Sequence, residues 1–134
     1  MTFEIVEHNG LRYAEILYKS ADNKSTKFYS EDDAALQLGL MVHSSGFVEI
    51  PHSHPEIPRD ATQTQQAFVV LTGKIDIDFF DYSGNLIKTI HLSQFDAILI
   101  IKGIHRIRVI ESSRCVTVKQ GPFLASLDKI EAQF

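Results

Sequence analysis

The chain has 134 residues, which fits one domain, and its charged residues give a formal net charge of −4. A mildly acidic chain has no general attraction to nucleic acid, so we expect no nucleic-acid partner. The single cysteine, Cys115, excludes an intramolecular disulfide. The residues after Met1 do not form a basic segment followed by an apolar run, and no apolar run reaches the roughly 18 residues of a membrane helix. We therefore expect a soluble cytoplasmic protein without a signal peptide or a membrane partner.

The first half of the chain carries weak secondary-structure signals. Leu11–Tyr18 fits a strand or a short helix, and Ser30–Asp33 fits either a helix cap with its first turn or a loop. Further on, Leu36–Val42 and Phe47–His52 have the composition of short strands.

The second half shows clear strand periodicity. Apolar residues occupy every other position of Lys74–Phe79, which predicts a half-buried strand. The turn-forming cluster Asp81–Asn85 and the strand-like Leu86–Leu92 complete a hairpin. Four further strands are expected at Ala67–Leu71, Ala97–Ile101, His105–Ile110 and Arg114–Lys119. Many short strands without intervening helices predict an all-β sandwich or barrel.

Three of the six histidines have the spacing of metal ligands. His52 and His54 are two positions apart, so their side chains leave the same face of a strand and can bind one ion. His105 follows Gly103 on a later expected strand. His8, His43 and His91 lie away from this pattern, and we expect no ligand role for them.

The wider sequence resembles a group of small bacterial cupin-domain proteins, some associated with polysaccharide biosynthesis. The resemblance covers about residues 37–134 and is carried by Gln37–Met41, Gly46, Pro51–His54, Thr64–Gln66, Leu71–Gly73, Asp78–Asp81, Gly103–His105, Val118–Phe123 and Asp128–Lys129. It implies a cupin-type double-stranded β-helix, a jelly-roll barrel, as a single domain over residues 1–134. Within that domain we expect an N-terminal arm at 1–35, the barrel at 36–123 and a C-terminal tail at 124–134.

The resemblance also implies a metal site, with two departures from the family pattern. The ligands would be His52, His54 and His105, together with Gln66 where the family has Glu. Glu56 is an alternative fourth ligand, in a 55–65 loop that is either a lid over the barrel mouth or an ordinary surface loop. The second departure is that His105 lies between Ile104 and Arg106 rather than between two glycines.

These observations leave two functions open. One is a metal-dependent enzyme, an isomerase, epimerase or dioxygenase, that acts on a small polar or anionic substrate such as a sugar or nucleotide-sugar. The other is a non-catalytic small-molecule-binding protein with a weak or degenerate metal site. The cofactor would be one divalent transition metal ion, Fe, Mn, Ni or Zn.

Individual residue roles are less defined. No catalytic residue can be assigned, since His43, Glu49 and Glu56 are the only nearby candidates for a general base. The candidates for substrate contact are Arg106, Lys119 and Gln120. We also expect a homodimer, in which strands of the N-terminal region pair across a two-fold axis.

Overall fold

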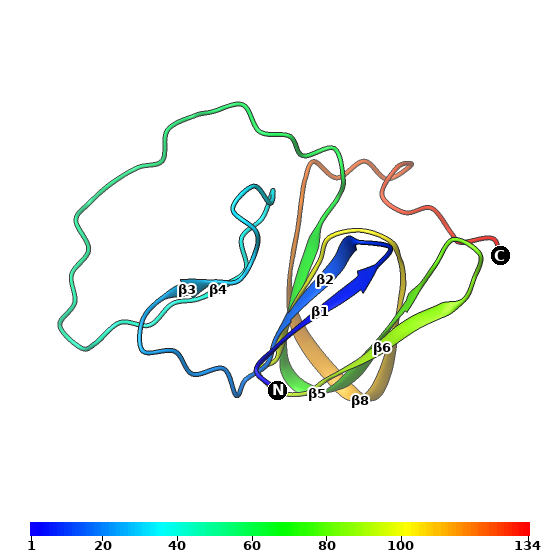
Figure 1. Cartoon of the computed structure of the whole chain (residues 1–134), viewed down its shortest axis with the longest axis horizontal. Helices are drawn as coiled ribbons and strands as arrows, with labels where there is room; N and C mark the ends of the chain where they lie inside the picture. Colours follow the sequence, from blue (N-terminus) through cyan, green and yellow to red (C-terminus); the bar gives the residue numbers. More distant parts are fainter.

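The computed structural model describes residues 1–134, and the fold consists of strands without helices. The strands are β1 (Phe3–His8), β2 (Leu11–Leu17), β3 (Lys27–Phe28), β4 (Gly39–Leu40), β5 (Gln66–Phe80), β6 (Leu86–Leu92), β7 (Ala97–Ile100) and β8 (Ile104–Lys119). Six of them form one antiparallel sheet in the order β1-β2-β7-β5-β6, with β8 paired to β5. The sheet curls into a half-barrel (Figure 1), so the prediction of an all-β fold is confirmed. The chain contains no helix of the length and apolar character that a membrane span requires.

Strand β5 is the centre of the sheet because it has three neighbours. Its first half pairs with β7, its second half pairs with β6, and β8 follows it along nearly its whole length. The pairing with β8 shifts register around Gly73, which has a φ of 85°. A Cβ at this position would lie 2.2 Å from the carbonyl oxygen of Ser112, so only glycine allows the two strands to approach here.

Two pairs of predicted strands are continuous in the structure. Ala67–Leu71 and Lys74–Phe79 are parts of β5, and His105–Ile110 and Arg114–Lys119 are parts of β8. The expectation of separate strands was wrong because Thr72-Gly73 has the composition of a turn. In the structure these residues form a bulge through which the strands stay paired.

The core lies on the inner face of the curled sheet. Twelve buried side chains form it: Val6, Tyr13, Ala14, Ile16, Val70, Ile75, Ile77, Phe79, Ile90, Leu92, Ile98 and Ile100. The register explains this, because Ile77 is paired with Ile90 on one side and with Ile107 on the other. Burial of one such side chain contributes about 2 kcal/mol, so the alternating pattern fixes which face is inside.

Strands β1 and β2 at the start of the chain belong to the large sheet, whereas β3 pairs with β4 in a separate two-stranded sheet. Strands β1 and β2 form a hairpin around Asn9-Gly10, whose φ values of 52° and 74° are those of a tight two-residue turn. Strand β2 then pairs with β7. Leu11–Leu17 is therefore a strand, and residues 30–33 form turns without a helix.

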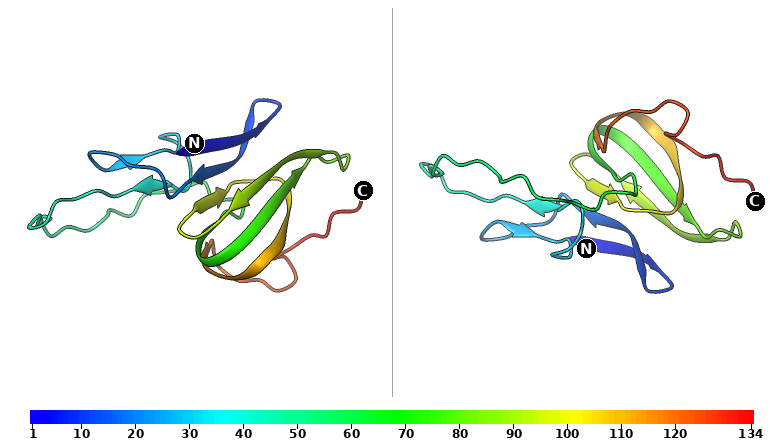
Figure 2. Two further views of the ribbon diagram at one scale, coloured as in Figure 1. Left: turned by 90° about the horizontal axis from the view of Figure 1, so that it is seen from below. Right: turned by 90° about the horizontal axis from the view of Figure 1, so that it is seen from above.

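Residues 41–65, named here the connecting segment, form no strand. The expected strand at Leu36–Val42 is reduced to the two residues of β4, and the expected strand at Phe47–His52 has no pairing partner. Pro51 has no backbone N–H, and Phe47 and Val48 break the alternation, so the local sequence does not force a strand. The segment projects from the sheet as a long exposed loop (Figures 1 and 2).

Candidate functional site

His52 and His54 lie close together in the connecting segment. Their ring centroids are 5.2 Å apart and the ring planes cross at 83°. The Nδ1 atom of His52 is 2.9 Å from the carbonyl oxygen of Ile50 and 2.9 Å from a carboxylate oxygen of Glu49. Both neighbours are hydrogen-bond acceptors, so Nδ1 is the nitrogen that donates in these contacts, and Nε2 is the ring nitrogen that they leave free.

His105 has the same local arrangement at the start of β8. Its Nδ1 atom lies 3.0 Å from the carbonyl oxygen of Gly103. The turn that precedes it requires glycine, since Gly103 has a φ of 92° and a Cβ there would lie 2.7 Å from the ring of Tyr13. His105 is paired with Phe79, which is a core residue, so its side chain is on the inner face of the half-barrel.

The three histidines do not meet within this single chain. No three side chains of His, Cys, Asp or Glu come close enough to hold a metal ion. A metal ion held by His52, His54 and His105 therefore does not fit this arrangement of one chain, and the ligand assignment stays a prediction.

The two candidates for a fourth ligand lie in different surroundings. Gln66 opens β5, and its Nε2 atom donates to the hydroxyl of Thr117 at 3.0 Å. This contact directs the amide nitrogen to Thr117 and leaves the carbonyl oxygen of Gln66 as the group that can bind a metal. Glu56 is exposed in the connecting segment and forms neither a hydrogen bond nor an ion pair.

The three candidates for substrate contact have protein partners. Arg106 donates from Nε and Nη2 to Asp78 at 3.0 and 2.9 Å. Because neighbours in a strand point to opposite faces, Arg106 lies on the outer face and His105 on the inner face. Lys119 pairs with Asp128 at 2.9 Å. Gln120 donates its backbone N–H to Gln65, and its buried side-chain oxygen has no partner.

A buried carboxylate on the outer face had not been anticipated. Asp78 is only 2 % exposed and accepts from Arg108 at 2.7 and 2.9 Å and from the hydroxyl of Thr89 at 2.7 Å. The hydrogen bonds from Arg108 hold the pKa of Asp78 well below its usual range, and those from Thr89 and Arg106 lower it further. The sequence contains a pattern that could have indicated this cluster: Asp76-x-Asp78 on β5 lies opposite Arg106-x-Arg108 on β8.

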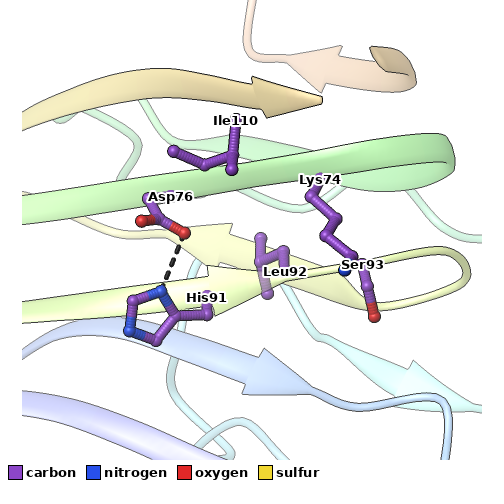
Figure 3. Close-up of a pocket in the computed structure, with 6 residues that line it drawn as sticks. All are labelled: Lys74, Asp76, His91, Leu92, Ser93 and Ile110. Atoms are coloured by element: carbon purple, nitrogen blue, oxygen red, sulfur yellow. Dashed lines mark hydrogen bonds and ion pairs between the residues drawn. The ribbon is translucent and has the colours of Figure 1, made fainter. Parts of the chain in front are cut away.

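A surface hollow of about 360 Å³ opens beside this cluster (Figure 3). Its lining residues are Lys74, Asp76, His91, Leu92, Ser93 and Ile110. Figure 3 shows His91 and Asp76 turned toward one another, with Nδ1 and Oδ1 2.8 Å apart. Arg108 also approaches Asp76, at 3.5 Å. His91, Asp76 and Arg108 already pair with one another, so the hollow has few free hydrogen-bonding groups for a ligand.

A second hollow of about 360 Å³ lies over the buried carboxylate of Glu15. Arg12 donates to Glu15 at 2.8 Å and the hydroxyl of Ser30 donates at 2.5 Å. Gln65 contributes to the lining, and its buried side-chain oxygen has no partner. Glu15 thus anchors the 30–38 turn to β2, a structural role that the sequence did not indicate.

Comparison with known proteins gives no relative: no family model, no curated protein and no solved structure matches this chain.

Proposed function

We propose that the protein binds one divalent transition metal ion through His52, His54 and His105. The observation that carries this proposal is the paired geometry of His52 and His54. A metal–nitrogen bond of about 2.1 Å places the centres of two imidazoles on one tetrahedral ion about 5 Å apart. The rings of His52 and His54 have a separation of 5.2 Å.

The hydrogen bonds of the rings support the same assignment. Metal-binding histidines usually donate their second ring N–H to a carbonyl or carboxylate, which fixes the tautomer and the ring orientation. His52 and His105 each direct Nδ1 at the carbonyl oxygen two residues earlier in the chain. Glu49 adds a carboxylate to this support at His52. The Nε2 atoms are therefore the nitrogens proposed to bind the ion.

We also propose that the complete fold is a cupin-type jelly roll. In a cupin-type jelly roll the connecting segment would run beside β8 and close the half-barrel, which would bring the histidine pair to His105. Strand β8 supports this because β5 is its only partner, and its other edge is free. Ile107 and Val109, which face the open side of the core, remain 41 % and 61 % exposed.

The ligand class follows from the charges of the proposed ligands. Three neutral imidazoles and the Gln66 carbonyl would leave the charge of a bound Fe, Mn, Ni or Zn ion uncompensated, which favours a small polar or anionic molecule such as a sugar or nucleotide-sugar. An isomerase or epimerase also needs a general base. Glu49, one candidate, is engaged by His52. This engagement favours a non-catalytic binding protein or a dioxygenase over an isomerase.

Calorimetric titration of chelator-treated protein with Zn²⁺, Mn²⁺ and Ni²⁺ tests the proposal. We expect a saturable site of one ion per chain in the wild type, weakened at least tenfold in His52→Ala and His105→Ala. His8→Ala is the matched control, since His8 is remote from the motif and is expected to leave the affinity unchanged. Equal affinities in all four proteins would contradict the proposal.

A further inference from the structure

The chain exposes more surface than a compact protein of its size. Its accessible surface is 9694 Å². A folded monomer of 15.1 kDa exposes about 7,100 Å², so roughly 2,600 Å² remains to be covered. Covering this area on each of two chains would bury about 5,200 Å² in total, at the upper end of the roughly 2,000–5,000 Å² or more that obligate dimer interfaces bury.

Two parts of the molecule expose groups that a partner chain could cover. One is the 16-residue strand β8, whose free edge presents unpaired N–H and C=O groups along its length. A long edge of this kind is a template for pairing with another strand. The other is the connecting segment, where Phe47, Val48 and Ile50 are 55 %, 84 % and 83 % exposed.

The two parts complement one another. The connecting segment needs hydrogen-bonding partners and apolar cover, and the edge and inner face of β8 offer both.

The connecting segment does not lie on its own β8. In all the views the segment projects from one side of the molecule, whereas the curved middle of β8 lies on the other side (Figures 1 and 2). A projecting segment without pairing partners and a vacant strand edge on the same chain are the two halves of a reciprocal exchange between identical chains.

We propose that two copies of the chain exchange their connecting segments, so that residues 47–54 of each chain pair with the free edge of β8 in the other. The site would then be shared, with His52 and His54 of one chain beside His105 of the partner subunit. This inference rests on the proposed metal site and explains why one chain does not assemble it. It places the dimer contact at β8 rather than at the N-terminal strands.

A mixed dimer tests whether the site is shared. A chain carrying His52→Ala and His54→Ala is coexpressed with a chain carrying His105→Ala, and the mixed dimer is isolated through two different tags that contain no histidine. Neither variant alone has a complete set of ligands. In the exchanged dimer one of the two sites regains all three histidines, so the metal content should be half that of the wild-type dimer. No metal in the mixed dimer, beside a metal-loaded wild type, would show that each segment folds onto its own chain and would overturn the inference.

A second experiment is independent of the metal. Light scattering should give a mass of about 30 kDa, twice that of the 15.1-kDa chain. Phe47→Asp combined with Ile50→Asp should yield monomers, whereas Ile130→Asp, in the exposed C-terminal tail, should remain dimeric. A monomeric wild type, or a double variant that remains dimeric, would overturn the exchange. A dimer that depends on Phe47 and Ile50 but binds no metal would support the exchange and refute the proposed function.

Discussion

Arg108 holds the buried carboxylate of Asp78 with two charge-assisted hydrogen bonds, of 2.7 Å from Nε and 2.9 Å from Nη2. The two residues lie on β8 and β5, so the pair fixes the register of these strands three positions from His105. The free edge of β8 is therefore held in place from its outer face before any partner reaches it.

Loss of the Asp78 charge should destabilise the fold. Asp78→Asn keeps the shape of the side chain but removes its negative charge. It also replaces one of the two carboxylate oxygens, which accept hydrogen bonds from Arg106 and Arg108, with an amide group. We expect the free energy of unfolding to fall by about 2 kcal/mol, since charge-assisted hydrogen bonds to a buried acceptor are lost. Urea denaturation measures this. Asp33→Asn, an exposed carboxylate without an ion pair, should change stability by less than about 0.5 kcal/mol, and equal effects at both sites would refute the role of Asp78.

The same carboxylate should make stability depend on acid. The folded pKa of Asp78 lies below its unfolded value of about 4, so its contribution is complete above that value and is lost as the pH falls toward the folded pKa. Urea midpoints at pH 6 and pH 3 should therefore differ more for the wild type than for Asp78→Asn. If both proteins lost stability equally between these pH values, Asp78 would not be the group that titrates.

Gly73 should not tolerate a side chain. Gly73→Ala forces a left-handed backbone on alanine and a contact of 2.2 Å with Ser112, so we expect a loss of about 2 kcal/mol or more in the free energy of unfolding. Gly10 also has a positive φ, but open space surrounds its Cβ position, so Gly10→Ala should cost only about 1 kcal/mol. Chemical denaturation of both variants separates crowding from backbone strain. A larger loss at Gly10 would contradict the account of the β5 bulge.

Metal binding should protect the connecting segment from trypsin. Arg59 is the only Lys or Arg between residues 41 and 65, so one cleavage reports on the whole segment. We expect rapid cleavage in chelator-treated protein and at least tenfold slower cleavage with metal, because a docked segment is a poor protease substrate. Mass spectrometry of the fragments measures this, with cleavage at the exposed Lys24 as the internal control. Protection that persisted in His105→Ala would show that His105 does not hold the segment.

The sequence predicted the parts of the fold that depend on local signals. The hairpin of β5 and β6 is correct because strand alternation flanks a turn in which Asp81 accepts from the backbone of Ser83 and Asn85. The continuity of β5 and β8 could not be predicted, since it depends on pairing between residues far apart in the chain. The strand expected at Phe47–His52 failed for the same reason: no neighbouring strand pairs with it in this chain.

In the candidate site, too, the features set by local sequence could be predicted and those set by contacts between distant residues could not. The proximity of His52 and His54 was expected from their spacing on a strand, and the structure has their rings 5.2 Å apart although no strand forms there. Their approach to His105 depends on where a long segment docks, which neither hydrophobic periodicity nor motif spacing determines. The Asp78 cluster was visible as alternating charges, but the register that places Asp78 opposite Arg106 and diagonal to Arg108 was not.

Elemental analysis of untagged protein, purified without chelators, determines whether the three histidines hold a metal ion. We expect about one Fe, Mn, Ni or Zn ion per chain in the wild type and in His8→Ala, and its loss in His52→Ala, His54→Ala and His105→Ala. Wild-type protein without metal, even after incubation with each ion and removal of the excess, would contradict this expectation.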